Sequence, residues 1–273
     1  MQGLSKQQAL DQLRSRIERI EKKPPLAEAS SRSTGELSLL ATPRGVIHEI
    51  FGDTQLEAGN TLGFALAQSR PLLGRDRPAV IILQLGPDGR ELGVPYGLGF
   101  KSFGIDPEAV VFGRMDNPID LLWAMEEAIA CRAVAAVVAD IATPIKALDF
   151  TASRRLSLRA AASGCSAFLI RYTREREASA ARFRWRLVSA LSQPPPFDAH
   201  APGRPRWQVT LEKGSLDGRR VSAAPGGEVF LVDWTERGLE RVATDGRRGR
   251  AQRPAPLSVP LPAAMGDGLS QAS

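Results

Sequence analysis

Short aliphatic and β-branched runs alternate with helical patterns through the middle of the chain. Candidate strands fall at 46–51, 79–85, 110–112, 134–139 and 166–171. Helical patterns lie between them at 59–73, 119–131 and 151–162. Gly164 follows the last of these helices and is suited to end it as a left-handed cap. Strands that alternate with helices predict an α/β fold, a mostly parallel sheet wound with crossover helices.

Beyond residue 171 the hydrophobic period changes to two. The segments 182–188, 207–211 and 228–234 alternate apolar and polar residues, which predicts antiparallel strands that continue one edge of the sheet. The proline-rich stretch 193–205 predicts a loop. From residue 244 onward Arg, Pro, Gly and Ala dominate without periodicity, which is typical of a disordered tail.

An amphipathic pattern precedes the first strand. In residues 4–23 an apolar stripe is flanked by basic side chains, and Pro24 and Pro25 end the pattern. A stripe this narrow suits a short coiled-coil seam, a docking arm or packing onto the chain's own body. The stripe consists of Leu10, Leu13, Ile17 and Ile20. We therefore expect a helix in 1–25, a linker and lead-in segment in 26–44, one domain in 45–243 and the tail in 244–273.

Composition places the chain among soluble globular proteins. Of its 273 residues, 43% are hydrophobic, enough to fill a core. Apolar runs such as 133–139 are far shorter than the roughly 18 residues that span a bilayer, and the first residues lack the apolar stretch of a secretory signal. We expect a cytoplasmic protein that contacts no membrane. Cys131 and Cys165 have no Cys or His neighbour at metal-ligand spacing, so we expect buried free thiols and no metal.

Positive charge is concentrated in the last third of the chain. The net charge is +6, and residues 171–253 hold seventeen Lys and Arg against ten Asp and Glu. Such asymmetry favours nucleic acid or an acidic protein as a partner. A general preference for arginine on solvated faces explains it equally well.

One segment nearly matches a phosphate-binding loop. A strand ends at Gly52, and a glycine-bearing loop leads to Gly59, Asn60 and Thr61. Six residues separate the glycines instead of four, and Asn60 stands where a lysine must reach the phosphates. One lost charge-assisted contact forfeits on the order of 1.5–3 kcal/mol. The sequence therefore predicts no ATP turnover, although Thr61 and the helix N-terminus retain features that hold a metal ion or an anion.

Other parts of an ATPase site are missing or isolated. The strand 79–85 ends without the carboxylate that activates an attacking water. Asp140 follows strand 134–139, where a metal-holding aspartate is expected, but an aspartate there also commonly starts a loop. We predict no catalytic residue and no cofactor. The vestigial nucleotide site consists of Gly52, Gly59, Asn60, Thr61 and Asp140.

Several arginines are candidates for contacts with nucleic acid or an acidic partner. Arg residues flank Trp185 and Trp207 at period two, an arrangement that stacks on single-stranded bases. The alternative is that both tryptophans face the core, and that the helical arginines line a solvated face. Trp123 and Met125 are interpreted as core and packing residues, and His48 as structural. The candidate arginines are Arg154, Arg155, Arg159, Arg184, Arg186 and Arg206.

The order of these motifs resembles RecA over residues 45–171. The chain has a Gly-x-Ile-x-Glu-Ile-aromatic-Gly strand before the loop, the run Leu98-Gly-Phe-Lys-Ser-Phe-Gly-Ile-Asp106, a helix in 120–129 and the strand ending in Asp140. Within that superfamily, finer details are similar to the ImuA family of damage-inducible RecA-like accessory proteins. These details are His48-Glu49, 122–127, 149–158 and the Arg-Trp pairs at 184–185 and 206–207.

The resemblance implies a RecA-like fold and a function in SOS-induced, error-prone translesion DNA synthesis. The implied partners are a degenerate Y-family polymerase homologue (ImuB-like), an error-prone C-family polymerase, RecA and DNA, although the last third of the chain carries no recognisable DNA-binding loop. Two other functions stay open. A SulA-like cell-division inhibitor is also a reduced RecA relative, whereas an ATP-dependent recombinase is disfavoured by Asn60 and the missing acid.

Overall fold

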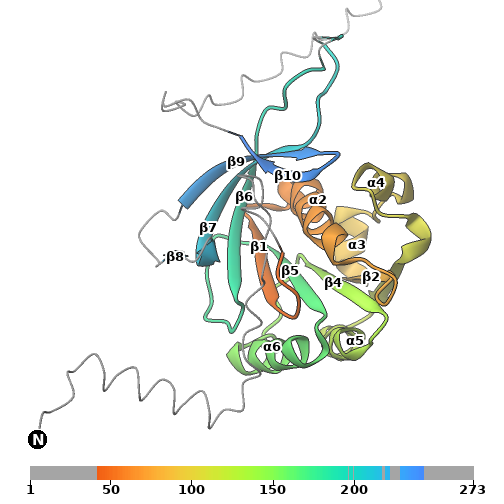
Figure 1. Ribbon diagram of the computed structural model, residues 1–273. Helices are drawn as coiled ribbons and strands as arrows, with labels where there is room; N and C mark the ends of the chain where they lie inside the picture. The colour runs from red at the N-terminus through yellow and green to blue at the C-terminus, as the bar shows by residue number, and fades with distance from the viewer. Residues whose placement is uncertain (1–41, 196, 199, 217–218, 222–227, 243–273) are drawn as a thin grey trace, which may run out of the picture. The chain divides into compact units, whose positions relative to one another are not determined.

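A mixed β-sheet organises the part of the chain that the computed structural model describes, residues 42–195, 197–198, 200–216, 219–221 and 228–242. The strand order is β10-β9-β7-β6-β1-β5-β4-β2-β3, and β8 pairs with β7 (Figure 1). The strands are β1 (Ile47–Gly52), β2 (Ala79–Leu85), β3 (Val110–Met115), β4 (Val134–Ile141), β5 (Ser166–Tyr172), β6 (Phe183–Ser189), β7 (Arg206–Leu216), β8 (Arg219–Val221), β9 (Glu228–Thr235) and β10 (Gly238–Arg241). The helix predicted in 1–25, the linker to residue 41 and the predicted tail lie outside the described residues.

The strands from β3 to β6 are parallel, and those beyond β6 are antiparallel. The prediction that β6 is antiparallel is wrong, because β6 pairs with β1 in parallel. The connection 173–182 returns the chain to the end of the sheet where the parallel strands begin, and it contains no helix. Ten extended residues reach roughly 33 Å, which is longer than a strand, so the connection is long enough for this return. A period of two cannot reveal strand direction. β7, β9 and β10 extend the edge in antiparallel fashion, as predicted for this region.

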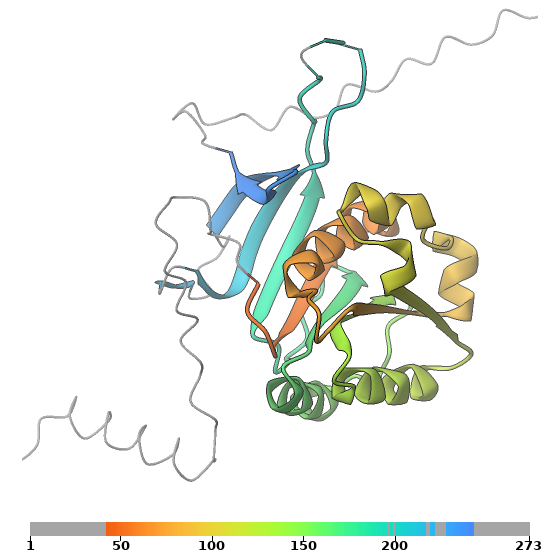
Figure 2. The same cartoon turned by 45° about the vertical axis from the view of Figure 1, so that its right-hand side comes forward.

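Helices cover both faces of the parallel strands. α2 (Ala58–Ser69) packs on one face, and α5 (Pro118–Ala130) and α6 (Phe150–Ser163) pack side by side on the other (Figure 2). These three helices confirm the helical patterns. Two short helices were missed, because α3 (Gly86–Leu92) and α4 (Gly97–Ser102) are glycine-rich and carry little helical signal. No helix in the described ranges has the length and apolar character to cross a membrane.

Side chains and a glycine fix the ends of α5 and α6. The Asn117 side chain accepts hydrogen bonds from the backbone N–H groups of Ile119 and Asp120, and Asp149 accepts one from Ala152. Gly164 ends α6 with a φ of 79°, the left-handed conformation that favours glycine. The cap predicted at Gly164 is confirmed.

The core forms two layers, one on each side of the sheet. Under α2 it includes both tryptophans of β6 and β7, Trp185 and Trp207, so the interpretation that they face the core is confirmed. Under α5 and α6 it includes Met125. Every residue of β1 and β4 is buried because helices or connections cover both faces.

Two burial predictions are wrong. Trp123 is 65% exposed, since it lies on the outward side of α5 while Leu121 and Met125 occupy the buried side. Cys131 is exposed because it follows the last residue of α5 at the surface, whereas Cys165 is buried as predicted. In neither case does the residue type reveal whether the side chain lies on the buried or the exposed side of the helix.

His48 is a structural residue, as predicted. Its ring lies between those of Phe168 and Phe183, with centroid distances of 4.8 Å to each. Its Nδ1 accepts a hydrogen bond of 3.2 Å from the indole N–H of Trp185, and its Nε2 has no partner within the described residues. Burial lowers the pKa of His48 to about 3, so the ring is neutral in the folded protein.

The buried His48 makes stability depend on pH. In the unfolded chain this histidine takes up a proton below pH 6.5, whereas in the folded protein it does so only near pH 3. The contribution of neutral His48 to the stability of the folded protein is therefore complete above pH 6.5. It is lost progressively as the pH falls toward 3. Between pH 7 and 5.5 we expect the free energy of unfolding to fall by about 1 kcal/mol more than in His48→Phe, measured by urea denaturation. Equal losses in both proteins would contradict this.

Candidate functional site

The loop after β1 carries the residues predicted as a vestigial nucleotide site. After Gly52 the chain forms a single 3-10 turn, Gln55–Glu57, which accommodates the longer glycine spacing, and α2 then begins. A Cβ atom on Gly52 would lie 2.8 Å from the Cβ of Glu57, so the turn packs directly on this glycine. Gly59 lies in the first turn of α2, where an added Cβ would have no neighbouring atom within 4 Å among the described residues.

Asn60 is held by the carboxylate of Glu57. Its Nδ2 donates a 2.6 Å hydrogen bond to Glu57 Oε2, and the Ser189 hydroxyl lies 3.3 Å from both oxygens of the same carboxylate. An anionic group already lies at the N-terminus of α2, the end that attracts negative charge. The position that must hold a phosphate-binding lysine therefore carries an amide bound to an acid of the same turn.

A series of hydrogen bonds joins β2, β4 and β5 at their carboxyl ends. The Tyr172 hydroxyl donates a 2.6 Å hydrogen bond to Asp140 Oδ1, and Gln84 Nε2 donates to Asp140 Oδ2 at 3.2 Å. Thr61 Oγ1 lies 3.4 Å from the Tyr172 hydroxyl and 3.0 Å from the carbonyl oxygen of Glu57. Thr61, Gln84 and Asp140 are all buried. The structure thus links Thr61 to Asp140 through Tyr172.

Burial governs the ionisation of Asp140 and Tyr172. It raises the pKa of Asp140 above its usual value, while the bonds from Tyr172 and Gln84 oppose that rise. Burial, followed by the nearby Asp140 carboxylate, also raises the pKa of Tyr172. Tyr172 was missed by the sequence reasoning, and the available signal was its position directly after the predicted strand 166–171.

A second carboxylate at this edge holds a loop together. Asp88 is buried in α3 and accepts hydrogen bonds from the backbone N–H of Ala142 at 2.8 Å and from the Thr143 hydroxyl at 2.7 Å. It therefore fixes the connection that follows β4. Sequence reasoning did not identify it because α3 itself was not predicted. In the described part of the chain, no group of three His, Cys, Asp or Glu has the geometry of a metal site.

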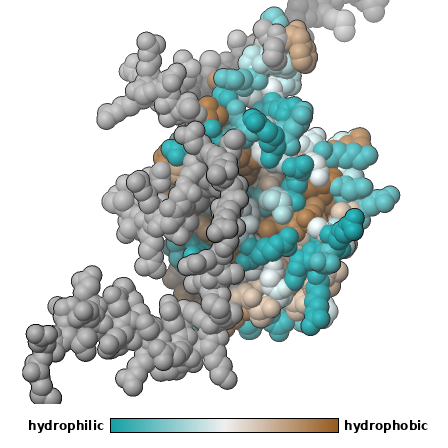
Figure 3. All heavy atoms as spheres, viewed as in Figure 1, coloured by the Kyte–Doolittle hydropathy of each residue, from teal (hydrophilic) through white to brown (hydrophobic). Residues whose placement is uncertain are grey.

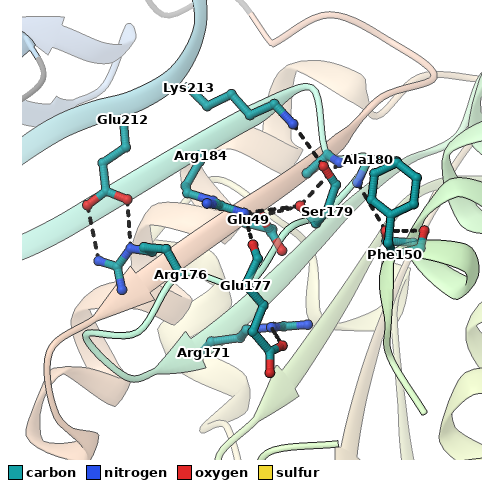
Figure 4. Close-up of polar contacts among 12 residues, drawn as sticks. Glu49, Phe150, Arg171, Arg176, Glu177, Ser179, Ala180, Arg184, Glu212 and Lys213 are labelled. Carbon is teal, nitrogen blue, oxygen red and sulfur yellow. Dashed lines mark hydrogen bonds and ion pairs between the residues drawn. The ribbon is translucent and has the colours of Figure 1, made fainter. Parts of the chain in front are cut away.

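The three candidate arginines on strands are each paired with an acid. Arg184 lies opposite the buried Glu49 and donates two hydrogen bonds to its Oε2, of 3.0 and 2.8 Å (Figure 4). Arg186 donates one hydrogen bond to each carboxylate oxygen of Asp53, at 2.8 and 2.6 Å. That hydrogen bonding lowers the pKa of Asp53. These side chains lie on the sheet face opposite Trp185.

Arg206 repeats the arrangement on the adjacent strand, β7. Its guanidinium forms an ion pair with Asp233, the residue directly opposite on β9. Alternation places it on the face away from Trp207, so the Arg-Trp pairs do not form the base-stacking surface considered from the sequence. Arg184 and Arg206 thus join neighbouring strands through charge pairs, and Arg186 joins β6 to the loop after β1.

The connection 173–182 covers the face where these pairs lie. Arg176 stacks on the Phe51 ring, 4.0 Å from its centroid, and binds Glu212 on β7 at 2.7 Å. The Ser179 hydroxyl donates a 2.7 Å hydrogen bond to Glu49, and Lys213 donates to the Ser179 carbonyl (Figure 4). Polar contacts thus replace the helix that is absent from this crossover.

The helical arginines lie on α6. Arg155 and Arg159 both bind Glu126 of α5, and Arg159 also lies 3.8 Å from Glu127. Arg154 is exposed and forms no ion pair with any described residue. The structure brings Arg155 and Arg159 together, as their spacing predicts, and uses them to join α5 to α6. Their predicted contacts with nucleic acid or a partner stay predictions.

A surface depression of about 540 Å³ lies near the C-terminal ends of α5 and α6. Arg77 fixes one wall by donating a 2.7 Å hydrogen bond to the carbonyl of Val134, where β4 begins. The depression is therefore at the opposite end of the sheet from Asp140. Its lining residues are Asp76, Arg77, Ala130, Arg132, Arg159, Ala162 and Ser163.

These elements define an α/β fold, with a mostly parallel sheet, helices on both faces and antiparallel strands at one side, as predicted. The chain is similar to the curated Protein ImuA from two strains of Caulobacter vibrioides, NA1000 / CB15N and ATCC 19089 / CIP 103742 / CB 15. Each is 31% identical over 125 residues, which cover 42% of this chain and 49% of the relative. The chain thus matches about half the length of these relatives.

No protein-family model matches the chain. Among solved structures, the RadB recombinase aligns with a TM-score of 0.45 and 14% identity, covering 74% of this chain and 93% of that one. The resemblance to ImuA that the motifs predict is confirmed as a sequence similarity.

The ion pair between Arg184 and Glu49 predicts a large effect on stability. Arg184→Met leaves the buried Glu49 carboxylate without its main partner and should lower the free energy of unfolding by about 3–5 kcal/mol. The same change at Arg204, whose pair with Glu236 is exposed, should cost less than about 1 kcal/mol. Denaturant unfolding measures both.

A double variant separates charge from packing. Adding Glu49→Leu to Arg184→Met should recover part of the loss, because no buried charge is then left unpaired. Equal destabilisation by the single and double variants would show that the pair stabilises the fold only through packing contacts and not through its charges.

Proposed function

We propose that this chain is a non-catalytic, RecA-like accessory factor in SOS-induced, error-prone translesion DNA synthesis. Its fold and its similarity to ImuA support the assignment. The observation that carries it is the bond between Asn60 and Glu57. A nucleotide-dependent relative needs a lysine free to reach phosphate, whereas this chain has an amide already bound at that position.

A triphosphate with Mg²⁺ does not fit the residues at this edge. Phosphates would meet the carboxylate of Glu57 at the N-terminus of α2, while Asp53 is already paired with Arg186. Asp140, in the position of a metal ligand, is bonded through both oxygens to Tyr172 and Gln84. Binding a metal there requires breaking both bonds. The proposed role therefore depends on surfaces that bind partners and needs no hydrolysis.

The partners follow from the same proposal. The chain acts with an ImuB-like Y-family polymerase homologue, an error-prone C-family polymerase and RecA, and it contacts single-stranded DNA. Because Arg184, Arg186 and Arg206 are paired with acids, phosphate contacts are assigned to basic residues elsewhere on the chain. Arg155 and Arg159 of α6 are paired with acids as well, so this assignment favours Arg154, which is exposed and forms no ion pair with any described residue.

ATP turnover tests the absence of catalysis. Purified full-length protein should hydrolyse ATP no faster than a blank, with or without single-stranded DNA. Asn60→Lys should not restore hydrolysis, because the new ammonium group would meet the Glu57 carboxylate. Turnover that disappears in Thr61→Ala would instead identify an enzyme.

A salt titration tests DNA binding. We expect the affinity for fluorescent single-stranded DNA to fall steeply between 50 and 200 mM salt, with a logarithmic slope of about −0.7 for each phosphate contacted. The measurement is fluorescence anisotropy on the full chain. Binding that does not change with salt, or its absence, would favour a division inhibitor of the SulA type.

Affinity capture from DNA-damaged cells identifies the partners. Mass spectrometry of proteins retained by the full chain should find the Y-family homologue and the C-family polymerase, and undamaged cells serve as the matched control. Division proteins without polymerase subunits would reverse the proposed function.

A further inference from the structure

Arginines lie along the edge of the sheet where the parallel strands begin, opposite the edge that carries Asp140. One arginine precedes each of the strands β6, β1, β4 and β2. In the sheet these strands follow one another in that order, with β5 between β1 and β4. We call this set the amino-edge row: Arg182, Arg44, Arg132 and Arg77.

Arg77 fills the place in the row where β5 has no basic residue before it. Its guanidinium donates hydrogen bonds to the carbonyl of Ser163, at the end of α6, and to that of Val134. A Cβ on Gly164 would lie 3.4 Å from this guanidinium, and a Cβ on Gly45 would lie 3.4 Å from the Gly164 Cα. The row is therefore continuous across β1, β5 and β4. From β6 to β4 it spans three strand spacings, roughly 14 Å.

The positive charge of the row is not cancelled by the described residues. The two partners of Arg77 are neutral carbonyl groups, so its charge remains. The other three arginines are exposed and form no ion pair with any described residue. Asp76 lies beside Arg77 in the sequence, and the exposed Arg75 on its other side offsets it. In this respect the row differs from Arg155 and Arg159, which bind acids of α5.

The depression of about 540 Å³ lies within the row, because Arg77 and Arg132 both line it. Its volume is in the range of sites that hold a small molecule. The apolar residues that line it are Ala130 and Ala162, and its other lining residues are polar or charged. Such a depression suits a sugar-phosphate unit, whereas the apolar anchor of a protein partner needs a pocket with larger apolar walls.

The chemistry of the row favours a nucleic-acid strand as its ligand. A guanidinium group presents planar donors that match phosphate, and a row of separate positive charges matches a chain of phosphates. The large apolar side chains that the described residues expose do not lie next to these four arginines in the sequence. Apolar and hydrophilic side chains are intermixed on the face that Figure 3 shows. Because the row contains no aromatic side chain that stacks on bases, it would contact the backbone alone.

We propose that single-stranded DNA binds along the amino-edge row, with its phosphates on the four arginines and without preference for base sequence. The inference rests on the proposed function, because it names a surface for the DNA contact assigned there. It extends that contact beyond Arg154 to the edge of the sheet opposite the vestigial nucleotide site.

Two matched double variants test the row in the full chain. Arg132→Ala with Arg182→Ala should weaken binding of fluorescent oligothymidine at 50 mM salt by about tenfold for each lost contact. The logarithmic salt slope should become less negative by about 0.7 for each contact. Arg90→Ala with Lys101→Ala removes two exposed basic residues of α3 and α4 and should change neither value. Fluorescence anisotropy measures binding, and urea denaturation checks that both variants are folded.

A probe on Cys131 gives a second measurement without altering the row. Cys131 is exposed next to Arg132 and Cys165 is buried, so an environment-sensitive thiol dye labels Cys131 selectively. Oligothymidine should change the dye's emission. The same dye on Arg90→Cys, in a chain with Cys131→Ser, should not respond.

The outcomes separate this inference from the proposed function. Salt-sensitive binding by the wild type that the row variant leaves unchanged, with a silent dye on Cys131, would overturn the row alone. Absence of DNA binding by the wild type would overturn the DNA contact of the proposed function and the row with it. Polyglutamate that displaces oligothymidine and binds the row more tightly would make an acidic protein the ligand and overturn the proposal.

Discussion

Burial of the central parallel strands on both faces is the constraint on which the rest of this structure depends. β1 and β4 are buried along their whole length, so every polar side chain on them must find a partner inside the protein or stay neutral. His48 stays neutral between two phenylalanine rings, Glu49 binds Arg184, and Asp140 binds Tyr172 and Gln84.

This constraint connects the fold to the proposed function. At the carboxyl edge, Asn60 and Asp140 are bound by residues of the chain itself. On the face of β6 and β7, acidic partners neutralise Arg184 and Arg206. Among the described residues, large apolar side chains are exposed at the surface, above all Trp123 on α5. A protein with charges paired inside the sheet and an exposed apolar helix surface is suited to binding other proteins.

The sequence predicted what short-range patterns determine. Helix and strand periodicity located α2, α5, α6 and the main strands, and Gly164 was placed correctly because a left-handed cap needs glycine. The direction of β6 was wrong because period-two alternation is identical in parallel and antiparallel strands. Trp123 was assigned to the core by residue type, and its outward side of α5 depends on how that helix rotates onto the sheet.

In the candidate site, too, the sequence predicted the features that depend on local pattern and missed those that depend on strand order. Asn60 and Asp140 were identified from spacing relative to strands, which is local information. Their partners Tyr172 and Gln84 come from different strands, and the pairing of Arg206 with Asp233 depends on sheet register. Without strand order or register, a sequence pattern cannot distinguish an arginine available to DNA from one paired across the sheet.

A carbon-13 NMR titration of the Asp140 carboxyl tests most directly whether internal bonds have replaced the nucleotide site. The account predicts that Asp140 has a pKa above that of an ordinary aspartate, that Tyr172→Phe raises it further by removing a hydrogen bond to the carboxylate, and that MgATP does not change it. An ordinary pKa, together with a carboxyl signal that shifts when MgATP is added, would contradict it.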